Sequence, residues 1–454
     1  MANFDAIERR QFVAGVLGVG STFVLGAGTA FGGPLVCRSP KPFRPGSDKR
    51  PIAERRTVEA LAANPVWKAQ MLKGYAAMRA FHPNDPRSLN QQGNLHNVMC
   101  SGGAIEVHQS DRFLAWHRCF LYFQERIVSS NIHYSGSGAP TPKPPDPKFR
   151  LAVWDWEATS TPLFPSAFTT GSLHDPRRHS AYYANEGNIL PALSVPATNP
   201  FEFYGYPVGG AGGSPVLENG PHGAIHMSTG LQTAPYKDMG NLSTAALDPV
   251  FCAHHGNIDR VWACWQDAHN NVTPNSIDPS TSSPFDAAWI HNTWRFTDWD
   301  GQCYSITPAS IIDYKQNLRY TYPDCGKRRE PRRLVISVSG SRLQSAEAGG
   351  EAASLILNDL QIPAPGYGRF VVIASINGES RPVGRFALFG HPMAMVMRRS
   401  VLATLSPEGV AALRTGASFA VAPEPADSGG LDIQVVRVTG GAPLKVTAAT
   451  LVAL

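Results

Sequence analysis

Apolar side chains recur at helical spacing in three segments of this chain. After Asn64-Pro65, an N-cap residue followed by proline at the first helical position, four side chains fall on one helix face: Trp67, Met71, Tyr75 and Met78. A second helix is predicted from Ser110 or Asp111 to about Val128, and a third from Asp248-Pro249 to about His269. This part of the chain is therefore predicted to be mainly α, with long irregular loops such as the turn-rich residues 157–220.

The hydrophobic pattern changes after residue 333. Short β-rich runs are predicted at 334–338, 370–376, 385–389, 433–438 and 444–451, and Asn377-Gly378 is a strong hairpin turn signal between two of them. Residues 334–454 are therefore predicted to form a separate C-terminal all-β sandwich domain. The preceding residues 326–333 include five basic residues and are predicted to be a solvated linker open to proteases, although ordinary exposed turns also carry such charge runs.

Composition limits the classes of protein to which the chain can belong. It has 454 residues, a hydrophobic content of 43% and a formal net charge of +5. That apolar content is too high for a disordered chain, and the small charge excess argues against dedicated nucleic-acid binding. No uninterrupted apolar run reaches the length of a membrane span. The unusual feature is a total of 14 His and 7 Cys.

The N-terminus has the layout of a removable targeting signal. Arg9-Arg10 stands before a mildly apolar, Gly/Ala-rich stretch, residues 13–31, and the arginine pair in this context resembles the twin-arginine export signal. We therefore expect residues 1–30 to be a signal peptide and the mature protein to be periplasmic or secreted, in an oxidising compartment. The alternatives are a membrane anchor or a buried first helix, and six glycines within residues 15–32 disfavour an anchor helix.

Seven histidines fall into three tight groups, which indicates a metal site. The groups are His96, His108 and His117; His222 and His226; and His254-His255. Imidazole suits Cu, Zn, Fe and Ni, and few carboxylates stand at matching positions. A lone histidine is more often an ordinary core or surface residue, but an i, i+4 pair with further histidines nearby is a rarer coincidence.

The spacings predict which of these side chains converge. At about 100° per residue, His222 and His226 lie about 40° apart on one helix face, whereas His108 and His117 lie about 180° apart. His108 is therefore predicted in the loop before the second helix, with His117 inside that helix.

In the third helix, His255 falls on the buried stripe and His254 falls beside it. The stripe consists of Phe251, His255, Ile258, Trp262 and Trp265. His255 is therefore the predicted ligand, and Asp259, one turn beyond it, is predicted to accept a hydrogen bond from a ligand ring and orient that ring. The predicted ligand set is three plus three: His96, His108 and His117 with His222, His226 and His255.

These motifs resemble those of the type-3 copper family of tyrosinases, catechol oxidases (polyphenol oxidases) and hemocyanins. The first-copper signature resembles FLAWHR at 113–118, and the second-copper signature resembles HGAIH at 222–226 with DPVF at 248–251 and HHGNIDRVW at 254–262. The resemblance covers roughly residues 65–325. It implies an antiparallel helix bundle that holds a dicopper site, two copper ions each bound by three of the six histidines, and oxidation of o-diphenols (catechols) to o-quinones with O2.

The resemblance is closest to the plant-type polyphenol oxidases. In that branch a cysteine spaced like Cys100 after His96 is joined to the second copper-A histidine, which implies a thioether between Cys100 and His108. The alternative is a free buried thiol. Glu218 matches a glutamate that holds an active-site water, and Leu242 stands at the position of an aromatic gate over copper A.

The same resemblance implies a domain organisation and a latent form. Residues 31–325 correspond to the dicopper catalytic domain, and residues 334–454 to a domain that shields the site. The alternative for this tail is a plain stability or partner-binding domain. Leu242 in place of an aromatic gate favours bulkier phenols. Gly223, which stands where the family associates an asparagine with monophenol deprotonation, weakens the case for monophenol hydroxylation.

Several alternative functions stay open. They are a tyrosinase that also hydroxylates monophenols, an o-aminophenol oxidase, and a hemocyanin-like protein that binds O2; a zinc hydrolase fits poorly because the set lacks a ligand carboxylate. The expected partners are a phenolic small molecule and O2, with a copper chaperone and an activating protease, and without nucleic acid or a stable membrane span after signal removal. We further expect Cys303 to pair with Cys325, and Cys119, Cys252 and Cys264 to be buried thiols.

Overall fold

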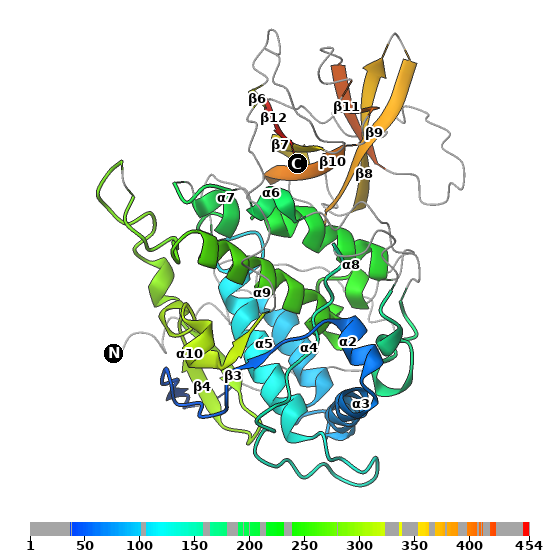
Figure 1. Ribbon diagram of the computed structural model, residues 1–454, viewed down its shortest axis with the longest axis vertical. Coiled ribbons are helices and arrows are strands. Elements are labelled where there is room, and N and C mark those ends of the chain that lie inside the picture. Colours follow the sequence, from blue (N-terminus) through cyan, green and yellow to red (C-terminus); the bar gives the residue numbers. More distant parts are fainter. Residues whose placement is uncertain are drawn as a thin grey trace, which may run out of the picture. The chain divides into compact units, whose positions relative to one another are not determined.

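Three long helices, α3 (Pro65–Ala80), α5 (Phe113–Ser130) and α9 (Val250–Ala268), are prominent in the computed structural model (Figure 1). Helix α5 contacts both α3 and α9, and α4 (Leu89–Met99) contacts α3. Nearly every residue of α5 and α9 is buried, as expected for helices in the middle of a core. The predicted mainly α character is therefore confirmed for this part of the chain.

The structure describes most of the chain up to residue 322 and parts of the C-terminal region. The described residues are 37, 39–100, 106–157, 164–178, 189–193, 195–198, 200–208, 215–230, 238–278, 280–322, 336–337, 353–362, 368–376, 379–388, 397–405, 408–409, 411, 418–423 and 448–453. The predicted signal peptide (1–30), the predicted linker (326–333) and the predicted turn Asn377-Gly378 lie outside these residues.

The long helices begin near the residues that the sequence predicts. The Asn64 side chain accepts a hydrogen bond from Trp67 N at 3.0 Å, and the predicted face of α3 is buried. At the start of α9, Asp248 accepts one from Val250 N at 2.9 Å. Helix α5 begins at Phe113, slightly later than predicted, because residues 108–112 form turns and a bend before it.

Short elements connect the long helices. They are the helices α2 (Val58–Ala63), α6 (Leu190–Leu193), α7 (Pro200–Tyr204), α8 (Gly223–Thr229) and α10 (Tyr314–Leu318), the π-helical turn η4 (Glu218–His222) and the 3-10 turns η2 (Ser166–Phe168), η3 (Gly171–Leu173), η5 (Asp238–Gly240), η6 (Ala245–Leu247), η7 (Trp289–His291) and η8 (Pro308–Ser310). The irregular character predicted for residues 157–220 is confirmed for the described part of that stretch, where the helical elements are at most five residues long.

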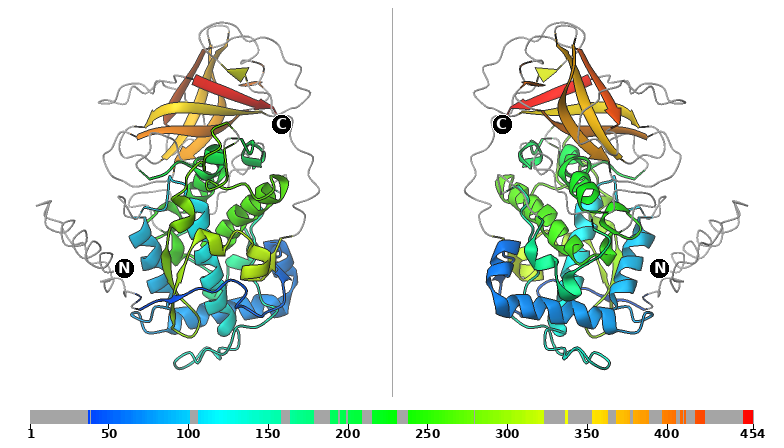
Figure 2. Two further views of the ribbon diagram at one scale, coloured as in Figure 1. Left: turned by 90° about the vertical axis from the view of Figure 1, so that its left-hand side faces the viewer. Right: turned by 90° about the vertical axis from the view of Figure 1, so that its right-hand side faces the viewer.

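The segment before α2 is tied to the end of the helical region by short strands. Strand β1 (Lys41–Pro42) pairs in parallel with β4 (Cys303–Ile306), which pairs antiparallel with β3 (Trp294–Thr297). Strand β2 (Ala53–Glu54) pairs in parallel with β5 (Tyr320–Thr321). These pairings bring two distant parts of the chain together (Figure 2).

The cysteines differ from the sequence-based expectation at two positions. Cys303 is bonded to Cys37 and not to Cys325, because the pairing of β1 with β4 brings the residues just before β1 to Cys303. Cys264 is also disulfide-bonded, so its prediction as a thiol is wrong. Cys119 and Cys252 are buried free thiols, as predicted.

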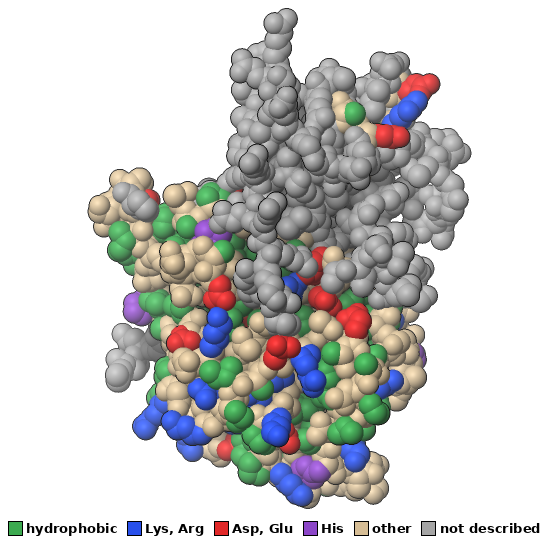
Figure 3. Space-filling view, in the orientation of Figure 1, with side chains coloured by type: hydrophobic (Ala, Val, Ile, Leu, Met, Phe, Trp, Pro, Cys, Tyr) green, Lys and Arg blue, Asp and Glu red, His purple; other side chains and the backbone are tan. Residues whose placement is uncertain are grey.

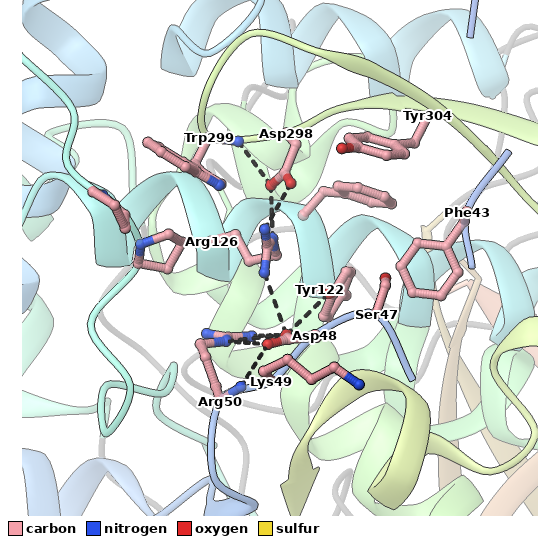
Figure 4. A pocket seen from close by; sticks show the side chains of 13 residues that line it. Phe43, Ser47, Asp48, Lys49, Arg50, Tyr122, Arg126, Asp298, Trp299 and Tyr304 are labelled. Carbon is pink, nitrogen blue, oxygen red and sulfur yellow. Dashed lines mark hydrogen bonds and ion pairs between the residues drawn. The ribbon is translucent and has the colours of Figure 1, made fainter. Parts of the chain in front are cut away.

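A hollow of about 420 Å³ lies where the N-terminal segment meets α5 (Figure 4). Four of its charged side chains pair with one another: Arg126 bonds Asp298 at 2.7 Å and Asp48 at 3.3 Å, and Arg50 bonds Asp48 at 2.9 Å. Tyr122 of α5 also donates to Asp48, at 3.0 Å. Because the charges satisfy one another, we interpret this network as an anchor for residues 43–50 on α5.

The described strands of the C-terminal region form one antiparallel sheet. Its order is β11-β8-β9-β10-β7-β12-β6, and the strands are β6 (Ile336–Ser337), β7 (Ala353–Ile362), β8 (Gly368–Ile376), β9 (Glu379–Leu388), β10 (Met397–Leu405), β11 (Ser418–Pro423) and β12 (Ala448–Ala453). The predicted β-rich character is confirmed. The two-sheet sandwich is not, because hydrogen bonds join all seven described strands into a single sheet.

On the face shown in Figure 3, basic and acidic side chains are interspersed. None of the helices that the structure describes combines the length and the apolarity needed to cross a membrane.

Candidate metal centre

The first histidine group is assembled by α4, the turn before α5, and α5 itself. His96, His108 and His117 are at most 2% exposed, and their ring centroids are 4.9 to 5.6 Å apart. Phe113 O accepts a hydrogen bond from His117 Nδ1 at 2.8 Å, which leaves His117 Nε2 for a metal. The predicted loop position of His108 and helical position of His117 are confirmed.

The second group lies on η4, α8 and α9. Ring centroids of His222, His226 and His255 are 4.6 to 5.5 Å apart, and the Nε2 atoms of His226 and His255 approach to 3.3 Å. Backbone carbonyls accept from the opposite ring nitrogens: Met239 O from His226 Nδ1 at 2.8 Å, and Glu218 O from His222 Nδ1 at 3.3 Å. The rings are therefore oriented with Nε2 toward the group.

The two groups are adjacent. The rings of His117 and His255 are stacked with centroids 4.3 Å apart, and those of His108 and His222 are 6.1 Å apart. The six predicted histidines therefore lie in two adjacent, buried groups.

Burial keeps the imidazoles of this centre neutral. It is the largest cause that lowers the pKa of His96, His117, His222 and His255 well below the usual value, and neighbouring imidazoles lower it further. Burial also lowers the pKa of His226 to about 3. A neutral imidazole with an available lone pair is the form that binds a metal, and a set of nitrogen donors without carboxylates fits a binuclear copper site.

His254 also reaches the second group, although it falls beside the buried stripe of α9 and was not predicted as a ligand. One of its ring nitrogens lies within 4.8 Å of a ring nitrogen of His222, His226 and His255. Neither nitrogen of His254 has a hydrogen-bond partner among the described residues. The ring centroids of His222 and His226 lie 5.3 and 4.6 Å from the ring centroid of His254. Two adjacent residues of α9, His254 and His255, therefore both reach the second group.

Cys100 caps the end of α4 beside the first group. Its Sγ is 3.6 Å from His96 Nε2 and within 4.8 Å of a ring nitrogen of His108. The thiol is buried, and burial raises its pKa well above the usual value. The sulfur is therefore near both rings, and the thioether to His108 stays a prediction.

Glu218 and Leu242 are both buried. The Glu218 carboxylate accepts a hydrogen bond at 2.7 Å from the backbone N–H of Gln109, the residue that directly follows His108. Because Glu218 lies on η4 together with His222, this bond links the two histidine groups. Leu242 is 2% exposed and follows Met239 by three residues. The roles predicted for Glu218 and Leu242 stay predictions.

The prediction that Asp259 orients a ligand ring is wrong. Its carboxylate accepts from Arg118 at 2.5 Å, Arg55 at 3.2 Å and Tyr320 at 2.6 Å, and also from Tyr322. These partners come from segments outside α9, which bring a buried cationic and phenolic cluster to Asp259. The arginines hold the pKa of Asp259 below its usual value although burial opposes them.

Met239 is a further site residue that the sequence analysis did not single out. It acts through its backbone carbonyl, so no side-chain pattern could have indicated it.

Comparisons with known proteins agree with this geometry. Residues 73–209 and 175–268 match the family model described as the common central domain of tyrosinase. The chain is 30% identical over 295 residues to a chloroplastic polyphenol oxidase of Vitis vinifera, covering 56% of this chain and 45% of that protein. It is 32% identical over 301 residues to (+)-larreatricin hydroxylase of Larrea tridentata, covering 58% and 48%. The chain thus spans about half the length of these curated relatives.

Solved structures extend the likeness to the fold. Grenache (Vitis vinifera) polyphenol oxidase matches with a TM-score of 0.54 and 28% identity, covering 68% of this chain and 95% of that chain. A functional unit of octopus hemocyanin matches with a TM-score of 0.57, covering 88% and 100%, but at 17% identity this shows the fold alone. The region that resembles the tyrosinase central domain, residues 73–268, therefore contains all six histidines that the sequence predicts as metal ligands.

Proposed function

We propose that this protein is a copper-dependent polyphenol oxidase that converts o-diphenols to o-quinones with O2. The observation that carries the proposal is the convergence of six buried histidines in two adjacent groups, with His226 and His255 Nε2 atoms 3.3 Å apart. Named relatives that include polyphenol oxidases and a catechol oxidase of Solanum tuberosum support the same reaction class.

Two copper ions bound by the two groups would supply the redox chemistry, with two catechols each losing two electrons and two protons while one O2 becomes two waters. The chain's own contribution is geometric. Carbonyl acceptors on His117, His222 and His226 fix the nitrogen that each ring presents. Burial keeps the donors neutral and excludes bulk water.

Glu218 is the candidate base for the phenolic proton, acting through a water. Its carboxylate is 2% exposed and held by Gln109 N beside His108. A carboxylate fixed within the centre by a backbone N–H can accept a proton without moving away from the substrate. The proposal predicts a lower rate constant with little change of copper content in Glu218→Gln.

Two residues bear on the choice of phenol. Leu242, in the position of the predicted gate, favours bulky o-diphenols, and Gly223, at the first position of α8, disfavours monophenol hydroxylation. Tyrosinase activity and o-aminophenol oxidation are the alternatives on the same site. The ratio of monophenol to catechol turnover by the wild-type protein separates them.

An oxygen carrier is the alternative from another class. The hemocyanin likeness supports a shared fold, while the named relatives at higher identity are phenol-modifying enzymes. Reversible O2 uptake without quinone formation would favour the carrier.

The C-terminal region is proposed to keep the enzyme latent. Strand β9 contacts α8 and η4, the two elements that carry His226 and His222, and Val383 of β9 is 1% exposed. Relatives that include a polyphenol oxidase of Prunus armeniaca are named as latent forms. An activating protease that cuts near residues 326–333 would then be a partner.

We also propose that the protein is exported. The Arg9-Arg10 motif supports twin-arginine export of a folded chain to the periplasm or the outside, and a copper chaperone would load the site first. Blocking this pathway should leave the full-length precursor inside the cell.

The central test is replacement of a predicted ligand. We expect His117→Ala to lose bound copper and to lower catechol oxidation by more than about 100-fold, because His117 belongs to the first group and its ring stacks on His255 of the second. The control His291→Ala changes an exposed histidine of η7 and should keep both properties. Full oxidase activity in His117→Ala would reject the assignment.

A further inference from the structure

Two consecutive arginines, Arg177 and Arg178, form ion pairs with two aspartates, Asp238 and Asp248, that lie close in the chain to residues supporting the second histidine group. Arg177 Nε is 2.6 Å from Asp238 Oδ2, and Arg178 Nε is 2.6 Å from Asp248 Oδ2. Both aspartates are at most 1% exposed. They enclose residues 238–248, the segment that runs from η5 to the start of α9.

The first of these ion pairs leads to His226. Asp238 directly precedes Met239, whose carbonyl accepts the hydrogen bond from His226 Nδ1. Asp238 has a φ of 49°, a left-handed conformation that is uncommon for residues other than glycine, although Asp and Asn adopt it more often than most. Its N–H donates to Thr244 Oγ1 at 2.7 Å, and Arg177 holds its carboxylate. Together these two contacts hold the residue that directly precedes Met239, and with it the segment of chain that carries the Met239 carbonyl.

The second ion pair leads to His255. Asp248 Oδ1 accepts from Val250 N at 2.9 Å in the first turn of α9, the helix that carries His255. Arg178 binds both Asp248 oxygens and also donates to Leu173 O at 2.7 Å and to Phe168 O. The Arg178 side chain is 7% exposed, so this two-point contact is made away from water. It fixes the start of α9 to the turn at residues 168–178.

We propose that Arg177 and Arg178 are positioning residues of the second metal site. Through Asp238 and Asp248 they hold His226 and His255 so that their Nε2 atoms converge on one metal. This inference rests on the proposed function. Both contacts lead to histidines of the second group, so the first copper should be unaffected.

An ion pair that only stabilised the fold would behave differently. It would lower the melting temperature of the copper-free protein and weaken both metals together. The Arg177 side chain is 46% exposed, so its replacement removes the charge without opening a cavity in the core. A matched control exists at the other end of α9, where Lys315 Nζ lies 3.0 Å from Asp267 in an exposed ion pair.

The test uses the copper-loaded full chain and four variants: Arg177→Gln, Asp238→Asn, Arg178→Lys and Lys315→Gln. Each is dialysed against graded amounts of a competing chelator, copper per chain is measured, and the melting temperature is recorded without copper. We expect Arg177→Gln to keep one copper as tightly as the wild type and to bind the other about 10- to 100-fold more weakly. Asn tolerates a left-handed backbone, so Asp238→Asn keeps the backbone at this position, removes the acidic group that faces Arg177 and Asp175, and should match Arg177→Gln.

The remaining outcomes separate this inference from the proposed function. Arg178→Lys keeps the charge but loses the two-point contact, so it should bind the same copper ion more weakly. Lys315→Gln should bind both copper ions as tightly as the wild type does. A wild-type protein without copper would reject the proposed function. Two equally tight coppers in Arg177→Gln, or two coppers weakened in step with a lower copper-free melting temperature, would overturn the positioning role.

Discussion

His254 and His255 are neighbours in the chain, and both reach the second histidine group, but His255 also stacks on His117 of the first. We therefore expect His255→Ala to lose one copper per chain and His254→Ala to keep both. The physical reason is that His255 Nε2 faces His226 Nε2 at 3.3 Å, the arrangement of two donors around one ion. Metal analysis of the two variants checks this. A copper lost in His254→Ala and retained in His255→Ala would reverse the assignment.

Asp111 gives a prediction for the dependence of stability on pH. Burial, and then a hydrogen bond with Asp286, raises the pKa of Asp111 to about 7. The folded protein therefore keeps this proton when the unfolded chain has lost it, so the contribution of Asp111 to stability is full below about pH 4 and is lost as the pH rises to about 7. Asp111→Asn removes the titration, so this part of the loss should disappear.

Urea unfolding at pH 5 and pH 8 measures the effect. The fall in the free energy of unfolding between these pH values should be smaller in Asp111→Asn than in the wild type by about 1 to 3 kcal/mol. Asp300→Asn, at an exposed position, serves as the control. An equal fall in both proteins would show that Asp111 is ionised in the folded state.

Predictions at residue scale succeeded where spacing along one helix decides the outcome. The single face for His222 and His226 and the loop position of His108 follow from helical geometry alone. The prediction for Asp259 failed because the partners of its carboxylate, Arg55 and Tyr320, come from segments far along the chain on either side of α9. No local pattern in α9 contains that information.

At the scale of elements, Gly74 lies where α3 packs closely against α5. A Cβ at this position would lie 2.6 Å from Val128 Cγ1 and 2.7 Å from Val128 O. The gain in helix propensity from Gly74→Ala is about 1 kcal/mol, but backbone contact cannot yield as a flexible side chain can. We expect a net loss of about 1 to 3 kcal/mol in the free energy of unfolding, measured by denaturant titration.

The control for this prediction lies on the same helix. Ala69 is exposed, and Ala69→Ser should change the free energy of unfolding by no more than about 0.5 kcal/mol. A Gly74→Ala protein as stable as the wild type would mean that α3 and α5 can move apart freely.

The sequence predicted elements best where a capping residue and a long apolar stripe coincide, as in α3. It predicted strands less well: β8 was found, whereas β7 and β10 were missed. These two strands pair along most of their length, from Ala353 with Leu405 to Ile362 with Met397. Such long-range pairing leaves a weaker local pattern than helical periodicity does.

At the scale of the whole molecule, the shielding role of the C-terminal region was expected from a family resemblance and not from the residues themselves. The described contacts support the proposal that this region shields the site, because β9 and β10 contact η4, and β9 also contacts α8. These helical elements present His222 and His226. A strand in this position would restrict the access of a phenol without altering the metal ligands.

This arrangement predicts that the shield can be weakened without cutting the chain. Val383 is 1% exposed in β9, the strand that contacts α8 and η4, and Val383→Asp would place a carboxylate at this buried position, which disfavours the closed state. We expect the uncut, copper-loaded variant to oxidise catechol at least about 10-fold faster than the uncut wild type, a shift of about 1.4 kcal/mol in the closing equilibrium. Copper content should not change, because no ligand is altered.

A matched variant and limited proteolysis make the test specific. Glu379→Gln changes an exposed residue of the same strand and should leave the rate at the wild-type level. Proteolysis near residues 326–333 should raise the wild-type rate toward that of Val383→Asp and add little to the variant, because both changes remove the same barrier. An uncut wild type as fast as the cut protein, or an additive gain in the cut variant, would contradict shielding by β9.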